Sequence, residues 1–384
     1  MRFEFATVDR IIFGWGTRRE LASIARSHGR RALVLTGNSP ERSESILTSC
    51  RAEGLELVFL RVSSEPTVAL VQAGVVQARA ERCEMVIAIG GGSVLDAGKA
   101  VAVLATNPRD ILDYLEVVGQ GKALEVAGLP FFAVPTTAGT GTEVTRNAVI
   151  TSEAHGVKAS LRSSSLLARV ALIDPELTLE LPRALTATTG LDAMTQLLEP
   201  LVSCRANPLV DGLCREGLAR AARALERACD TPGERAARED MALASLFSGL
   251  ALANAGLGAV HGFAAPIGGK FNAPHGAVCA ALLPEVMEVN ILALRQRRPD
   301  SKALVRYAEA AQLLTGSPQA SPEDGVTWVR ELRRRLAVPG LGTYGISAAD
   351  QAALCAGAAV ASSMKGNPLP LLPEELETIL LRSL

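Results

Sequence analysis

The chain is poor in aromatic side chains and carries almost no net charge. Phenylalanine, tryptophan and tyrosine make up 4% of its 384 residues, and 39 lysines and arginines are balanced by 40 aspartates and glutamates. Proteins that bind nucleic acids combine basic surfaces with aromatic stacking platforms, which this composition does not favour. The Arg-rich stretch over residues 215–238 alternates with glutamate, as solvated helix faces do. We therefore expect no nucleic-acid partner.

Cysteine motifs, a leader segment and long apolar runs are also missing. The seven cysteines are scattered and form no Cys-x-x-Cys pair, which favours a reducing cytoplasm. Residues 1–20 mix charges and glycine with apolar positions, unlike a signal peptide. No run of about 18 uncharged apolar residues suggests a membrane span. We expect a soluble, unprocessed, cytoplasmic protein with no membrane partner.

Aliphatic residues, by contrast, are abundant and are arranged differently in the two halves. Apolar side chains make up 48% of the chain, and 384 residues exceed what one core of ordinary size accommodates. In the first half, short apolar runs alternate with helix-length segments, a pattern typical of a doubly wound α/β domain with a parallel sheet. The predicted strands are residues 32–36, 55–62, 85–89, 131–134 and 170–173, and the predicted crossover helices are residues 41–53, 67–82 and 93–106.

The second half is rich in alanine and leucine and has almost no β-branched runs. This pattern predicts an all-α helical bundle. The predicted helices are residues 185–203, 208–229, 235–265, 291–314, 322–336 and 348–363. An Asp-Pro step at residues 174–175 and a Leu-Pro step at residues 181–182 mark the change of pattern. We therefore predict a Rossmann-like α/β domain over residues 1–180 and a helical domain over residues 181–384.

A triple glycine follows the predicted strand 85–89 and precedes a helix that begins near Ser93. Glycines let the backbone turn sharply and approach a diphosphate, whose charge is stabilised by the free N–H groups at the start of a helix. Gly91, Gly92, Ser93 and Asp96 are therefore candidate cofactor-binding residues. A tight strand-to-helix turn capped by Ser93 is the alternative interpretation.

A second polar loop, Val134-Pro-Thr-Thr-Ala-Gly-Thr-Gly-Thr-Glu143, follows the predicted strand 131–134. Its hydroxyls and glycines suit the polar groups of a large phosphorylated ligand, and open α/β sheets bind ligands at the carboxyl ends of their strands. The candidate residues are Thr136, Thr137 and Thr140, with Lys158 as an additional cation. Two such loops favour a dinucleotide cofactor.

Two of the four histidines, His261 and His275, stand fourteen residues apart in a segment rich in glycine and alanine. Imidazole is the commonest side-chain ligand for metal ions. A lone histidine is nevertheless more often a hydrogen-bonded core residue, so a metal site requires further ligands.

Four motifs occur in order along the whole chain: Gly90-Gly-Gly-Ser-x-x-Asp-x-x-Lys99, Pro135-Thr-Thr-Ala-Gly-Thr-Gly-Thr-Glu143, Thr189-Gly-Leu-Asp-Ala193, and the segment from His261 to His275. With these motifs the chain resembles the iron-dependent (group III) alcohol dehydrogenase family. The resemblance implies NAD(P)-linked interconversion of alcohols and aldehydes or ketones at a divalent metal, Fe²⁺ or Zn²⁺, with catalytic roles for His261 and His275. It also implies a homodimer, which the apolar segment over residues 8–16 favours.

In that family the metal is held by an aspartate and a histidine four residues apart and by two further histidines fourteen apart. Asp192, His261 and His275 match three of these positions, but Gln196 stands at the second. A glutamine oxygen is neutral and harder than imidazole, so a site of these four residues is expected to hold Fe²⁺ or Zn²⁺ less tightly. Ala265 likewise replaces a histidine that many members keep near the substrate.

The turn after the predicted strand 32–36 bears on the choice between NAD and NADP. In NAD-preferring relatives an aspartate stands at the position of Gly37, where it accepts from the adenosine ribose and repels a 2′-phosphate. The replacement by glycine favours NADP, with Asn38 and Ser39 as candidate phosphate-binding residues. NAD is the alternative, because the same residues also suit an ordinary polar turn. We expect His275 to contact the nicotinamide side of the cofactor as well.

The resemblance implies a small alcohol or carbonyl compound as substrate, and maleylacetate-reductase-like activity is one candidate. Two other functions are compatible with the same scaffold. A dehydroquinate-synthase-like lyase needs several cations for its phosphorylated substrate, whereas residues 254–275 contain only Lys270. A dinucleotide-binding protein with decayed or metal-independent activity is the second, since Gln196 and Ala265 both replace family histidines.

Overall fold

The computed structural model describes residues 2–271 and 273–384, and its chain divides into two compact units. The α/β unit comprises residues 6–137 and 141–179, and the helical unit contains residues 180–384 together with the short segment 138–140 and the N-terminal residues up to Phe5. The main division therefore falls between Leu179 and Glu180, next to the predicted boundary. A single boundary at this point does not describe residues 138–140, which belong with the helices.

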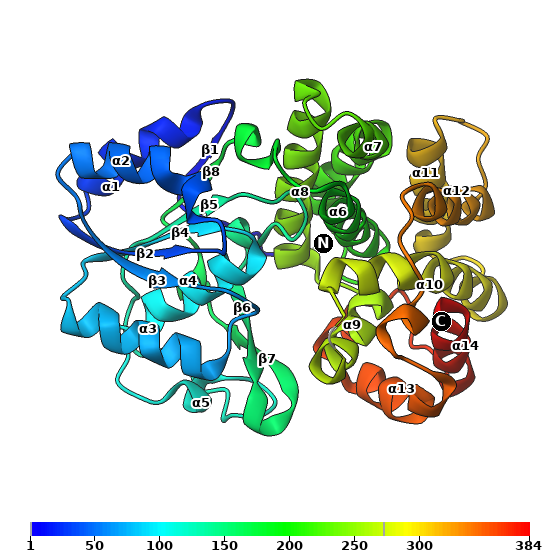
Figure 1. Ribbon diagram of the computed structural model, residues 1–384. Coiled ribbons are helices and arrows are strands. Elements are labelled where there is room, and N and C mark those ends of the chain that lie inside the picture. Colours follow the sequence, from blue (N-terminus) through cyan, green and yellow to red (C-terminus); the bar gives the residue numbers. More distant parts are fainter. Residues whose placement is uncertain (1, 272) are drawn as a thin grey trace. The chain divides into compact units, whose positions relative to one another are not determined.

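The α/β unit is built on a six-stranded parallel sheet in the order β1-β8-β5-β4-β2-β3 (Figure 1). Its strands are β1 Ile11–Phe13, β2 Arg31–Thr36, β3 Glu56–Arg61, β4 Met85–Gly90, β5 Phe131–Pro135 and β8 Val170–Ile173. Strand β4 is buried at every position, which explains why it has a continuous apolar run rather than alternation. The five predicted strands all lie in this sheet, and β1, which sequence reasoning did not predict, forms one edge.

Helices cover both faces of the sheet. They are α1 Leu21–Arg26, α2 Glu44–Ala52, α3 Val68–Ala80, α4 Gly92–Leu104 and the short α5 Ile111–Tyr114. Apolar side chains of α1 and α2 share one core cluster with one face of the strands, while α4 packs against β4, β5 and α3. An antiparallel hairpin of β6 Asn147–Ser152 and β7 Val157–Arg162 was not predicted, because its strands mix polar and half-exposed positions.

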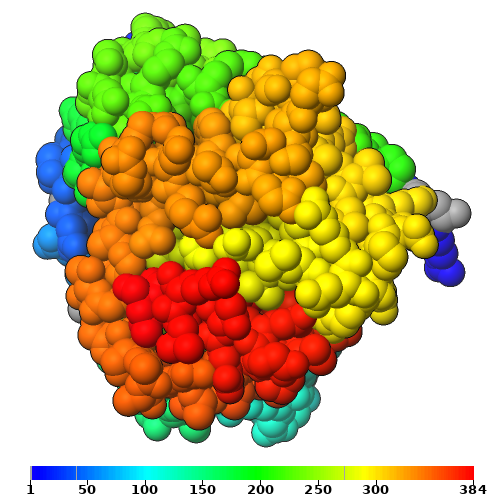
Figure 2. Space-filling view, turned by 90° about the vertical axis from the view of Figure 1, so that its right-hand side faces the viewer, coloured from blue at the N-terminus to red at the C-terminus, as the bar shows by residue number. Residues whose placement is uncertain are grey.

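The helical unit is an all-α bundle, as predicted. Its helices are α6 Arg183–Val202, α7 Pro208–Asp230, α8 Arg235–Ala255, α9 Ala259–Lys270, α10 His275–Arg297, α11 Lys302–Thr315, α12 Pro322–Arg335, α13 Gln351–Val360 and α14 Pro373–Ser383. The later helices, yellow to red in Figure 2, pack side by side on the face shown there. Helix α10 is long and apolar enough to cross a membrane, but 89% of its apolar window is buried inside the fold, as in the core helix of a water-soluble bundle.

Two helix predictions need correction. Residues 235–265 form two helices, α8 and α9, that meet at an angle of 97°. The break is at Gly256, whose φ of +71° is a conformation that residues with a Cβ rarely adopt. The predicted helix 291–314 is likewise divided between α10 and α11, and α10 begins sixteen residues earlier, at His275. The turn after α8 places His261 in the first turn of α9, and the early start of α10 places His275 at its first position.

Candidate metal and cofactor sites

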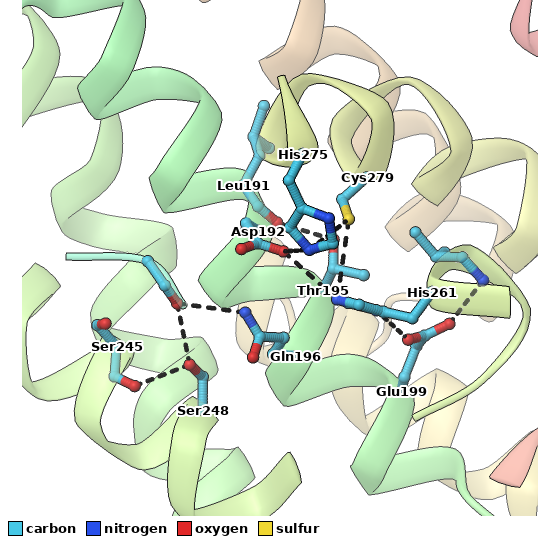
Figure 3. Close-up of polar contacts among 12 residues, drawn as sticks. Leu191, Asp192, Thr195, Gln196, Glu199, Ser245, Ser248, His261, His275 and Cys279 are labelled. Carbon is cyan, nitrogen blue, oxygen red and sulfur yellow. Dashed lines mark hydrogen bonds and ion pairs between the residues drawn. The ribbon is translucent and has the colours of Figure 1, made fainter. Parts of the chain in front are cut away.

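Four side chains from three helices converge inside the helical unit (Figure 3). Helix α6 contributes Asp192, α9 contributes His261, and α10 contributes His275 and Cys279, with one potential ligand atom of each lying within 4.8 Å of the others. Asp192 Oδ1 is 3.5 Å from His261 Nε2 and 3.7 Å from His275 Nε2. We call these four residues the metal cluster.

Glu199, two turns after Asp192 on α6, fixes the orientation of His261. Its Oε2 lies 2.7 Å from His261 Nδ1, and its Oε1 accepts a 2.7 Å hydrogen bond from the backbone N–H of Val260. A carboxylate beside Nδ1 keeps the proton there, so Nε2 is left as the electron-pair donor facing Asp192. The carboxylate also lies at the N-terminus of α9, where the helix dipole stabilises negative charge. This close approach requires Gly258, since a Cβ there would lie 2.9 Å from Glu199 Oε1.

The cluster fits a divalent cation. Asp192 is 1% exposed, and its Oδ1 has no hydrogen-bond donor among the described residues. A buried carboxylate oxygen without a partner is costly, and a cation bound between it and the two imidazoles would remove that cost. Carboxylate, imidazole and thiolate are all ligands of first-row divalent metals.

The charges in the cluster also favour a bound cation. The pKa of His275 is raised to about 9, chiefly by its electrostatic interaction with Cys279 and then, against the effect of burial, by that with Asp192. Burial lowers the pKa of His261, but its interactions with Cys279, Glu199 and the nearby Asp192 carboxylate outweigh burial and hold this pKa well above its ordinary value. Burial likewise raises the pKa of Asp192, but the two imidazoles outweigh it and the pKa is lowered. Positive charge is thus stabilised at this point of the fold.

Gln196 is the fourth ligand expected from the sequence, but its side-chain amide is hydrogen-bonded outside the metal cluster. Its Nε2 donates to the backbone oxygen of Gly139 at 3.3 Å, an acceptor shared with the hydroxyl of Ser248. Figure 3 shows the amide on the side of α6 that faces Ser248.

Cys279 was not among the predicted residues. Cys279 follows His275 by four residues, and this spacing places two side chains on the same face of a helix. The spacing was not informative because the sequence predicted no helix at His275.

The glycine loop forms the start of α4, as expected. Gly91 is the extended residue before the helix, and Gly92 is its first residue. A Cβ on Gly91 would lie 3.2 Å from the methyl group of Thr137, so the two loops predicted to bind the cofactor are in contact here. Thr136 lies beside them, donating its N–H to Gly90. The first N–H groups of α4 have no carbonyl partner within the helix, which makes this point suitable for a phosphate.

Other predicted cofactor residues lie in different surroundings. Asp96 accepts a hydrogen bond from the N–H of Val149 and so connects α4 to β6. Thr140 belongs to the segment grouped with the helical unit. Lys158 forms an ion pair with Glu65, and its side chain is 12% exposed.

A fully buried lysine that sequence reasoning did not single out binds residues directly after the polar loop of residues 134–143. Lys99 Nζ donates to the backbone oxygen of Thr145, to its hydroxyl and to the backbone oxygen of Asn147, at 2.9, 2.7 and 3.1 Å. Burial lowers the pKa of Lys99 to about 8, and burial raises the pKa of Glu143 in the same loop to about 7. Lys99 therefore has a structural role that depends on a buried amine rather than on a surface charge.

The turn after β2 combines Gly37 with a cation from the neighbouring strand. Asn38 donates its side-chain amide to Ser63 at 2.8 Å, and Arg61 donates to the backbone oxygen of Asn38 at 3.1 Å. Arg61 pairs with Thr36 in the β2–β3 register and is exposed. Ser39 precedes a short 3₁₀ turn. Arg61 could not be selected from the sequence, because only the pairing of β2 with β3 brings it to this turn.

Comparison with known proteins agrees with this geometry. Residues 9–175 match the model of the iron-containing alcohol dehydrogenase family, and residues 186–384 match the C-terminal model of the same family. The chain belongs to the iron-containing alcohol dehydrogenase family. It is 35% identical to long-chain-alcohol dehydrogenase 1 of Geobacillus thermodenitrificans over 97% of this chain and 96% of that protein. It is 34% identical to 1,3-propanediol dehydrogenase of Klebsiella pneumoniae over 88% of this chain and 89% of that protein.

Solved structures show the same relationship. A crystal structure of 1,3-propanediol oxidoreductase superimposes with a TM-score of 0.93 and 30% sequence identity, covering 100% of both chains. This iron-containing-type alcohol dehydrogenase is an NAD(P)-dependent oxidoreductase that interconverts alcohols and carbonyl compounds with the help of a divalent metal. The family prediction, the fold class and the reaction class made from the sequence are therefore confirmed.

Proposed function

We propose that this alcohol dehydrogenase oxidises terminal alcohols to aldehydes, and reduces the aldehydes, with NADP(H) and a divalent ion held by Asp192, His261 and His275. The observation that carries the proposal is the buried Asp192 Oδ1, which lies between two imidazoles and has no hydrogen-bond donor in the part of the chain that the structure describes. The relatives named above act on long-chain alcohols and 1,3-propanediol, which supports a terminal alcohol as substrate.

Each part of the proposed site has a distinct task. When bound, the ion supplies Lewis-acid stabilisation of negative charge on the substrate oxygen, and the nicotinamide donates or accepts hydride. Asp192 partly neutralises the ion, and Glu199 holds His261 in the tautomer whose Nε2 faces it. The His275 side chain is 40% exposed in the structure, which leaves its imidazole accessible to substrate and nicotinamide. We propose catalytic roles for His261 and His275 on this basis.

We propose that the dinucleotide lies at the carboxyl ends of the strands. In this arrangement the N–H groups of Gly91, Gly92 and Ser93 bind the diphosphate, and Thr136 and Thr137 hydrogen-bond to it or to the adjoining ribose. Asp96 and Lys99 act indirectly, because Asp96 connects α4 to β6 and Lys99 connects α4 to Thr145, just after the polar loop of residues 134–143. Thr140 and Lys158 remain candidates from the sequence alone, and the ion pair between Lys158 and Glu65 disfavours a direct phosphate contact by Lys158.

The preference for NADP rests on Gly37 and on the cation beside it. No carboxylate stands at Gly37 to repel a 2′-phosphate, and Arg61 lies at the adjacent Asn38. A guanidinium binds phosphate well because its N–H groups match the geometry of phosphate oxygens. Comparing kcat/KM for NADPH and NADH with one aldehyde tests this directly. A higher value for NADPH is expected, and a clear preference for NADH would show that Arg61 does not serve this role.

We also propose that two copies of the chain associate in the cytoplasm. Strand β1 forms an edge of the sheet and is paired to β8 on one side, and Ile11 on it is 36% exposed. Edge strands with exposed apolar residues are common sites of pairing between subunits. Light scattering after size-exclusion chromatography should give twice the mass of the 40.2 kDa chain, and a monomer at micromolar concentration would refute the dimer.

A further inference from the structure

Cys279 is the member of the metal cluster that the sequence motifs of the family did not predict. Its Sγ lies 3.8 Å from His261 Nε2 and 3.7 Å from His275 Nε2, and the side chain is completely buried. At tetrahedral angles and the usual bond lengths, the ligand atoms of an ion bound to nitrogen, oxygen and sulfur lie roughly 3.3–3.6 Å apart, and such a site can expand to take a fifth ligand when a substrate oxygen binds. The two separations of the Cys279 sulfur are within a few tenths of an ångström of this range.

Gln196 does not compete for the same position. Its amide nitrogen is hydrogen-bonded to Gly139, and this acceptor is also used by Ser248. Because Gly139 offers a carbonyl oxygen, the nitrogen end of the amide must face it. A role for Gln196 as a metal ligand would require this buried amide to rotate and leave that hydrogen bond.

His275 and Cys279 are four residues apart on α10 and therefore share one face of the helix. Asp192 and Gln196 have the same spacing on α6, but the Gln196 amide is hydrogen-bonded to Gly139. The pair of ligands on a single helix is thus supplied by α10 in this chain, while α6 and α9 supply one ligand each.

We propose that Cys279 binds the catalytic ion as a thiolate, so that the resident site is Asp192, His261, His275 and Cys279, and that this donor set favours Zn²⁺ over Fe²⁺. This inference rests on the metal-dependent function proposed above. On binding, the Cys279 thiol loses its proton to solvent and its sulfur forms a bond to the ion, with no change in oxidation state. A thiolate is softer than a glutamine oxygen or an imidazole and is a common ligand of zinc.

Cobalt substitution tests the proposal by spectroscopy, independently of turnover. Metal-free full-length protein is titrated with Co²⁺, and the near-ultraviolet spectrum is recorded for the wild type and for Cys279→Ser, Gln196→Ala and Cys204→Ser. The wild type should develop a thiolate-to-cobalt charge-transfer band that saturates at one ion per chain. The band should be lost in Cys279→Ser and kept in Gln196→Ala. The band should also be kept in the control variant Cys204→Ser, because Cys204 is exposed and its thiol donates a hydrogen bond to the backbone oxygen of Lys365.

Zinc affinity, measured by competition with a chromophoric chelator, gives a second readout. Loss of a ligand should weaken binding at least as much as the roughly 10–100-fold that loss of an outer-shell partner costs, so Cys279→Ser should fall by about 100-fold. Stoichiometric Co²⁺ without the band in the wild type would overturn the role of Cys279 and leave the metal-dependent function intact, even if the variant failed to fold. Absence of any bound metal in a fully active enzyme would overturn both.

Discussion

Glu199 and His261 are joined by a hydrogen bond of 2.7 Å between Oε2 and Nδ1, and both side chains are buried. The same carboxylate binds the first turn of α9 through Val260. One residue of α6 therefore sets both the orientation of a metal-binding imidazole and the position of the helix that carries it. This arrangement leads to the first prediction.

Replacing Glu199 by glutamine should weaken metal binding by about 10–100-fold, because the neutral amide no longer increases the basicity of His261 or fixes its tautomer. The side chain keeps its size, so the free energy of unfolding should change much less than the metal affinity. Isothermal titration of metal-free protein with Zn²⁺ measures the affinity. Glu216→Gln on α7 is a suitable control, since Glu216 pairs with Arg220 at the surface. Equal affinities for Glu199→Gln and the wild type would contradict the assigned role.

Introducing an aspartate at Gly37 should reverse the cofactor preference. A Cβ there would lie 3.7 Å from Val94, an ordinary contact distance, so the fold accommodates a side chain. Repulsion between a carboxylate and a 2′-phosphate costs several kcal/mol, and a change of about 100-fold in the NADPH-to-NADH ratio of kcat/KM corresponds to about 2.7 kcal/mol. Gly37→Ala adds the same Cβ without charge and should leave the ratio within a few-fold of wild type. An unchanged ratio in the aspartate variant would place the 2′-phosphate elsewhere.

Lys99→Met should destabilise the α/β unit. The substitution leaves the carbonyl oxygens of Thr145 and Asn147 without the donor they have in the structure. Unpaired buried acceptors cost about 1–3 kcal/mol each, partly offset because a buried amine is also lost. We expect a net loss of about 2–4 kcal/mol in urea unfolding followed by circular dichroism. Lys122→Met removes a partly exposed lysine paired with Asp113 and should cost less than about 1 kcal/mol. Similar losses for the two variants would argue against a special role for Lys99.

The α/β fold was largely predictable because buried parallel strands leave a strong local signal. The run Met85-Val-Ile-Ala-Ile, followed by glycines, predicted both β4 and the start of α4 to within about a residue or two. The hairpin of β6 and β7 was missed because its half-exposed strands lack the continuous apolar runs that mark the buried strands, although β7 alternates apolar and polar residues as Val-Lys-Ala-Ser-Leu-Arg. The edge strand β1 is three residues long, too short for a periodic signal.

The metal cluster was predictable only in part. Asp192, His261 and His275 are chemically conspicuous and match motifs of the family, and the structure brings them together. Gln196 was predicted as a ligand and Cys279 was not singled out, because spacing along the sequence does not say where a helix begins or which acceptors surround a side chain. The start of α10 and the acceptor offered by Gly139 are both consequences of tertiary packing.

The most direct test of the account is the metal requirement of NADPH-linked aldehyde reduction. The purified enzyme is stripped with a chelator, its metal content is verified by mass spectrometry, and Zn²⁺ or Fe²⁺ is then added back in steps. Asp192→Asn serves as the variant with a weakened site. Activity is predicted to fall to background on removal of the ion and to return in proportion to occupancy, up to one ion per chain, in the wild type alone. Full activity in protein verified to be free of metal would contradict the central claim.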